Sequence, residues 1–80
     1  MTNQEIVEKV NSFLIDRLEI GEELIKPESN LRADLGLTSL DMQEMMMFCK
    51  STFGFIPVRR DLFSLNTLND VYSLIEQKQR

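Results

Sequence analysis

The sequence predicts an all-α fold of three main helices and one short helix, and three observations lead to this prediction. Hydrophobic residues recur at helical spacing in three separate segments of the chain. Each of these segments begins with a threonine that has an acidic residue three positions later, as in the capping box of a helix N-terminus. No stretch of any length alternates hydrophobic and polar residues as a half-buried strand does.

The first helix is expected to start at the capping pair Thr2 and Glu5 and to run to about Glu19. Gly21 follows as a natural C-terminal stop. The buried face of this helix is expected to contain Ile6, Val7, Val10, Phe13, Leu14 and Leu18.

A long loop then leads through Pro27 to Thr38. Structureless loops of more than about 12 to 15 residues are uncommon in a compact domain, so we expect this segment to pack across the helices as a strap. The residues expected to anchor it are Leu24, Ile25, Leu31, Leu35 and Leu37.

The second helix is expected from Ser39 to Phe53, and its residues separate into two stripes. The stripe expected to face the core contains Met42, Met45, Met46, Cys49 and Phe53. The other, exposed stripe contains Leu40, Gln43, Glu44, Met47 and Ser51.

Two further helices complete the prediction. Gly54 and Pro57 break the helical pattern and leave room for a single short turn around Asp61 to Phe63. The last helix is expected to begin at Thr67, whose partner in the capping box is Asp70. Its buried face is expected to contain Leu68, Val71, Tyr72 and Ile75.

Composition restricts the possible functions. The 80 residues are 42% hydrophobic and 28% charged, which is typical of one small globular domain. The chain has no histidine and a single cysteine, Cys49, so it has no Ser-His or Cys-His pair and no usual set of zinc ligands. The net charge of −4 comes without a basic stripe. We therefore expect neither an enzyme nor a nucleic-acid-binding protein.

The same features bear on location. No hydrophobic run approaches the roughly 18 residues of a membrane span. The N-terminal residues MTNQEIVEKV contain neither the basic nor the hydrophobic region of a signal peptide. We expect a cytoplasmic protein that does not insert into membranes.

Ser39 is the candidate functional residue. Thr38 and Asp41 have capping-box spacing, so Thr38 is expected to be the N-cap and Ser39 the first helical residue, with its hydroxyl free. Unpaired N–H groups and the helix dipole favour an anion at that position, so a phosphate ester on Ser39 would be stabilised there. The alternative is that Ser39 only shares in capping.

The segment DLGLTSLDMQEM resembles the phosphopantetheine attachment motif of acyl carrier proteins, which reads D-L-G-x-D-S-L-D before a helix rich in acidic and hydrophobic residues. The segments KPESNL, FGFIP and LFSLNTLNDVYSLI follow the same family's order and spacing. The resemblance implies a four-helix bundle forming one carrier domain over residues 1–80. It also implies that Ser39 carries a 4'-phosphopantetheine arm derived from coenzyme A, with acyl cargo bound as a thioester.

The resemblance also implies partners. A phosphopantetheinyl transferase would add the arm, and acyl-loading and condensing enzymes such as ketosynthases would use the cargo. The expected docking residues are Thr38, Leu40, Asp41, Glu44 and Met47. The pathway would be fatty acid, polyketide or related biosynthesis, and we expect the carrier to be a monomer.

Two departures from the family pattern indicate a specialised carrier. Thr38 replaces the aspartate that usually precedes the modified serine, so one docking carboxylate is lost. Lys50, Ser51 and Thr52 occupy a part of the second helix that is acidic in many carriers of fatty acid synthesis. Two other functions stay open at this point, namely an aminoacyl or peptidyl carrier of a nonribosomal pathway and an unmodified helical adaptor.

Overall fold

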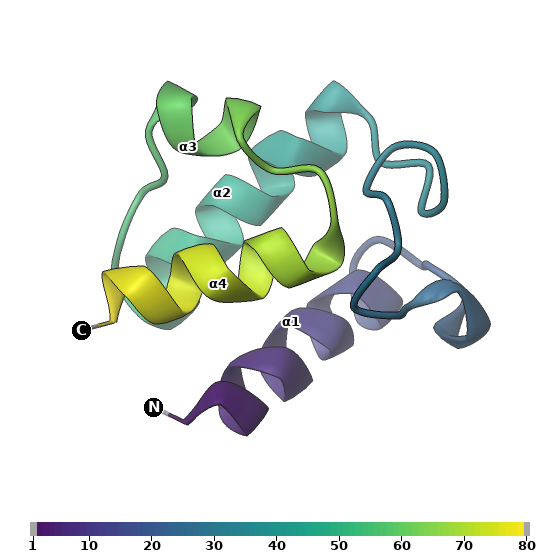
Figure 1. Ribbon diagram of the computed structural model, residues 1–80, viewed down its shortest axis with the longest axis horizontal. Helices are drawn as coiled ribbons and strands as arrows, with labels where there is room; N and C mark the ends of the chain where they lie inside the picture. The colour runs from purple at the N-terminus through teal and green to yellow at the C-terminus, as the bar shows by residue number, and fades with distance from the viewer. Residues whose placement is uncertain (1, 80) are drawn as a thin grey trace.

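The computed structural model describes residues 2–79, which fold into a bundle of four α-helices (Figure 1). Helix α1 spans Asn3–Asp16, α2 spans Ser39–Phe53, α3 spans Arg59–Phe63 and α4 spans Leu68–Lys78. Within the described part of the chain no helix is long and hydrophobic enough to cross a membrane. The predicted all-α bundle with one short helix is confirmed.

Helix starts were predicted well. Thr2, Thr38 and Thr67 are the N-caps of α1, α2 and α4, and each forms the predicted capping box with the acidic residue three positions later. The short helix α3 begins at Arg59, two residues before the predicted turn, and the Val58 N–H donates to Asp61 Oδ2 over 3.1 Å. Short polar side chains therefore set the start of every α-helix in residues 2–79.

The end of α1 differs from the prediction. The helix ends at Asp16 and not at about Glu19, and the turn is made by Glu19 with a φ of 55° instead of by Gly21. The Ile20 N–H donates to the carbonyl oxygen of Leu14 over 3.0 Å, which closes the end of the helix. Packing of the partly buried Ile20 against the core helps to offset the cost of the left-handed conformation at Glu19.

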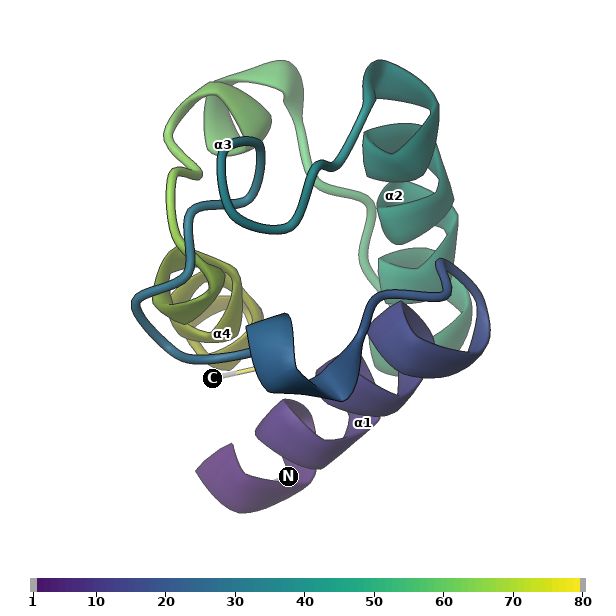
Figure 2. The ribbon, with the colours of Figure 1, turned by 90° about the vertical axis from the view of Figure 1, so that its right-hand side faces the viewer.

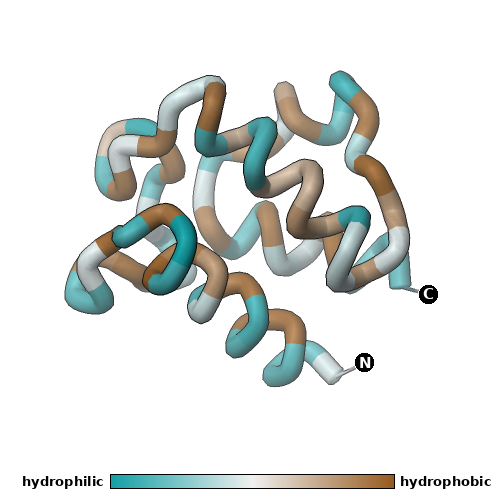
Figure 3. Tube along the Cα trace, turned by 180° about the vertical axis from the view of Figure 1, so that it is seen from behind, coloured by the Kyte–Doolittle hydropathy of each residue, from teal (hydrophilic) through white to brown (hydrophobic). Residues whose placement is uncertain are grey.

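The core lies between α1, α2, α4 and the strap. Hydrophobic residues interrupt hydrophilic ones along each helix, as Figure 3 shows by colour. The buried cluster contains Ile6, Val10, Phe13 and Leu14 of α1, Leu31, Leu35 and Leu37 of the strap, Met45, Cys49 and Phe53 of α2, and Leu68, Val71, Tyr72 and Ile75 of α4. The four residues predicted for α4 are all present in it.

Three core predictions need correction. Met46 is only half-buried and lies outside the buried cluster, because successive helical residues are about 100° apart and it falls at the edge of the stripe of Met45 and Cys49. Phe48, which the stripes omitted, packs against the core instead. Leu24 is exposed because it lies in a short 3-10 helix, Glu22–Leu24, that turns it outward, although the rest of the strap packs as predicted.

The strap is attached to the start of α4 by backbone hydrogen bonds. The Leu31 N–H donates to the Asn66 carbonyl oxygen over 2.9 Å, and the Leu68 N–H donates to the Ser29 carbonyl oxygen over 2.9 Å. Figure 2 shows the loop passing α4 before it reaches α2. These hydrogen bonds fix the path of the loop that leads to Thr38 and Ser39.

The orientation of α2 yields the first prediction. Phe53 and Met45 are buried whereas Met47 is 63% exposed. Replacing each of them with alanine should therefore lower the free energy of unfolding by clearly different amounts. We expect Phe53→Ala to cost about 3–5 kcal/mol, Met45→Ala about 2–5 kcal/mol and Met47→Ala no more than about 0.5 kcal/mol. Urea unfolding followed by circular dichroism measures all three. A cost for Met47→Ala equal to that of Phe53→Ala would contradict the orientation.

Cys49 yields a second prediction, about pH. Its side chain is 2% exposed, and burial raises the pKa of the thiol from 9.0 to about 11. Between these values the unfolded chain binds fewer protons than the folded chain, so stability should fall as pH rises from 9 toward 11. Denaturant unfolding across this range should show a steeper fall for the unchanged protein than for Cys49→Ala, in which the raised pKa of Tyr72 still contributes. An equal slope in both would contradict it.

Candidate functional site

The candidate site is the N-terminal end of α2. The Asp41 N–H donates to Thr38 Oγ1 over 3.2 Å, and the Thr38 N–H donates to Asp41 Oδ2 over 2.9 Å. Ser39 follows as the first residue of the helix and is exposed. The predicted capping arrangement is confirmed, and it occupies Thr38 and Asp41 while leaving the Ser39 hydroxyl without a hydrogen bond in the described residues.

The free groups at this end suit a negatively charged substituent. An α-helix leaves its first N–H groups without partners inside the helix. The capping box satisfies those of Thr38 and Asp41, so within residues 2–79 those of Ser39 and Leu40 stay available. A phosphate ester on the adjacent hydroxyl would be favoured by these donors and the helix dipole by about 0.3–1 kcal/mol.

The predicted docking residues do not all have the same environment. Leu40 and Met47 are 72% and 63% exposed, so the hydrophobic part of the predicted surface is accessible. Asp41 is half-buried, and one of its carboxylate oxygens accepts the Thr38 N–H. The charge of Asp41 is therefore held at the start of α2. The other acidic docking residue, Glu44, lies three residues later in the helix and is exposed.

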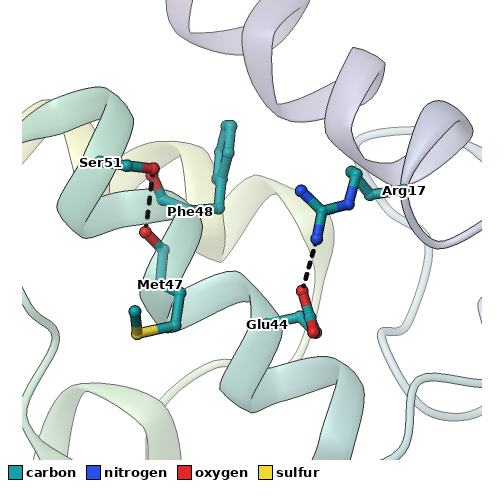
Figure 4. A network of polar contacts seen from close by, with 5 residues as sticks. All are labelled: Arg17, Glu44, Met47, Phe48 and Ser51. Atoms are coloured by element: carbon teal, nitrogen blue, oxygen red, sulfur yellow. Dashed lines mark hydrogen bonds and ion pairs between the residues drawn. The ribbon is translucent and has the colours of Figure 1, made fainter.

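Glu44 has a partner that the sequence did not indicate. A terminal nitrogen of the Arg17 guanidinium lies 3.2 Å from Glu44 Oε2, and the two side chains are 68% and 51% exposed (Figure 4). One helical turn away, the rings of Phe13 and Phe48 are stacked with centroids 4.4 Å apart. Phe13 and Arg17 are four residues apart, as are Glu44 and Phe48. Because α1 and α2 run antiparallel, this shared spacing lets Phe13 meet Phe48 while Arg17 meets Glu44.

Two open grooves meet at this ion pair. The larger, of about 800 Å³, lies between α1 and α2 with Phe13 and Phe48 among its lining residues. The smaller, of about 470 Å³, extends toward Leu40 and Asp41 near the start of α2. Arg17, Glu44 and Met47 line both grooves. Figure 4 shows Phe48 pointing toward α1 and Met47 pointing away from it.

The site offers one free hydroxyl on a rigid helix end beside an accessible mixed surface. Among residues 2–79 no group of three or more metal-ligating side chains comes together. A free hydroxyl with a docking surface around it is what a carrier domain requires, since such a domain presents a group to other proteins.

Comparisons with known proteins agree with this class. Residues 8–75 match the family described as "Phosphopantetheine attachment site". The chain is also 35% identical over 77 residues to the acyl carrier protein of Thermotoga maritima, covering 96% of this chain and 95% of that protein. The chain belongs to the acyl carrier protein family. Members are carriers and not enzymes, they carry 4'-phosphopantetheine, and they interact with phosphopantetheinyl transferases and biosynthetic enzymes.

Proposed function

We propose that residues 1–80 form a single acyl carrier domain in which Ser39 bears the 4'-phosphopantetheine arm and acyl intermediates are held as thioesters on its thiol. The observation that carries this proposal is the free Ser39 hydroxyl at the capped start of α2, inside a segment that matches the attachment family. The N–H groups of Ser39 and Leu40 would bind the phosphate of the arm. The arm supplies the thiol, and the chain presents it.

The finer features of the function are also proposals. The carrier would serve fatty acid, polyketide or related biosynthesis in the cytoplasm as a monomer, with a ketosynthase among its partners. Thr38, Leu40, Asp41, Glu44 and Met47 would form its docking surface. Exposed Leu40 and Met47 support a hydrophobic anchor, since a few accessible hydrophobic residues carry most of the affinity in many interfaces.

Lys50 and Thr38 support a specialised carrier. Lys50 and the exposed Ser51 lie on the later part of α2, and Thr38 provides a cap without a charge. Attraction to the basic faces of partner enzymes should therefore be weaker than in carriers with an acidic α2, because exposed charge pairs contribute modestly. A dedicated set of partner enzymes would suit this surface.

A direct test is modification of the protein by a broad-specificity phosphopantetheinyl transferase with coenzyme A. We expect the intact mass to increase by one 4'-phosphopantetheine arm, and we expect no increase for Ser39→Ala. Ser51→Ala, which removes another exposed hydroxyl of α2, is the matched control and should be modified normally. Equal modification of Ser39→Ala, or none of the unchanged protein by several transferases, would overturn the proposal.

A further prediction concerns the residue before Ser39. Aspartate is as good an N-cap as threonine, so Thr38→Asp should keep the start of α2 while it adds a carboxylate beside the serine. The rate of modification by a transferase with a basic docking face should rise. Thr38→Asn keeps the cap without the charge and should leave the rate unchanged. Equal rates for the aspartate and asparagine variants would show that charge at this position does not guide the transferase.

A further inference from the structure

Arg17 lies where partner enzymes are proposed to dock, although it is outside the attachment segment DLGLTSLDMQEM. It is the C-cap residue of α1, and its backbone N–H donates to the Phe13 carbonyl oxygen over 2.9 Å. The side chain extends from this fixed position to Glu44 on α2, as Figure 4 shows. The ion pair therefore joins the two helices at the edge of the surface that contains Leu40 and Met47.

The pair changes what Glu44 offers to another protein. A carboxylate with an arginine 3.2 Å from one of its oxygens is partly neutralised, so an incoming lysine or arginine competes with Arg17 for Glu44. Arg17 also places a positive charge among the residues lining the smaller groove, together with Leu40 and Asp41. A partner with only basic residues on its docking face would have to compete with Arg17 for Glu44, and its positive charges would also be repelled by Arg17.

We propose that Arg17 is a specificity-determining residue of the docking surface, which withdraws Glu44 from partner enzymes whose docking faces offer only basic residues. The favoured partner presents a carboxylate to Arg17 and, beside it, a basic residue to Glu44. Each member of the ion pair then gains a new partner of opposite charge. This inference rests on the proposed carrier function, because it assumes that partners approach the face of α2 near Ser39.

The size of the effect follows from the exposure of the pair. Both side chains are more than half exposed, and exposed ion pairs contribute little because water and salt screen them. Competition by Arg17 should therefore change affinity for a basic partner by about 2- to 5-fold. Such a factor alters the choice between partners without preventing any of them from binding.

The experiment measures kcat and KM for modification by a phosphopantetheinyl transferase with a basic docking face. Arg17→Gln should lower KM by about 2- to 5-fold with kcat unchanged, because Glu44 is released for binding. Arg17→Lys keeps the charge and should stay close to the unchanged protein. In the Arg17→Gln protein, a second change of Glu44→Gln should remove the gain. At about 1 M salt, where the Debye length is about 3 Å, the gain should disappear.

Lys9→Gln is the matched control for net charge. It removes the same charge from the same helix, eight residues and therefore about 12 Å along the axis from Arg17. It should change KM much less than Arg17→Gln does. Equal effects of the two variants would mean that only overall charge matters, and a gain that survives Glu44→Gln would mean that Arg17 does not act through Glu44. Either result overturns the inference.

A binding measurement separates this inference from the proposed function. Calorimetry of Ser39→Ala versions with the same transferase gives affinities without any transfer of the arm. If Ser39 is modified but neither KM nor affinity responds to Arg17→Gln, the role of Arg17 is wrong and the carrier function stands. If no variant is modified and none binds the transferase, both are overturned.

Discussion

The reciprocal hydrogen bonds between Thr38 and Asp41 are the constraint on which the site depends. The strap ends at Thr38, whose backbone is extended with φ −97° and ψ 176°. Helix α2 begins at the next residue, Ser39. Once the start is fixed, the turn of 3.6 residues determines which side chains of α2 enter the core and which meet solvent. The free serine, the exposed Leu40 and Met47 and the buried Met45 are all consequences of one cap. Capping substitutions typically cost about 1 kcal/mol, a substantial part of the stability of a small domain.

Much of the fold could be predicted because its determinants are local. Each capping box consists of two residues three positions apart, and the faces of α1 and α4 repeat within a single helix, so both can be recognised without knowing the rest of the chain. The same is true of Ser39, whose exposure follows from the Thr38 cap beside it. The strap could be predicted because a long loop with several leucines has few alternatives to packing on the core.

The features that could not be predicted depend on contacts between distant segments. Arg17 and Glu44 are 27 residues apart, and nothing within either helix indicates that they meet. Phe48 lies outside the core stripe of α2, and its ring packs against Phe13 of α1 and edge-on against Phe53. The end of α1 at Asp16 is followed by a left-handed Glu19 and by Ile20, which packs partly buried against the core, and this tertiary contact cannot be recognised within α1 itself. A four-residue spacing shared by Phe13–Arg17 and Glu44–Phe48 was the available signal, and it becomes informative only once the helices are known to be antiparallel.

The two ends of the described chain lie together, away from the start of α2 (Figure 1). The Asn3 side-chain amide donates to Glu76 Oε2 over 2.9 Å, and the Gln79 side-chain amide donates to the carbonyl oxygen of Phe53, the last residue of α2. Residues near both termini thus gather at the end of the bundle opposite Ser39. Tags, linkers or fused domains added at either terminus would emerge from that far end, so this carrier can be immobilised on a surface or joined to a larger assembly with Ser39 still facing outward.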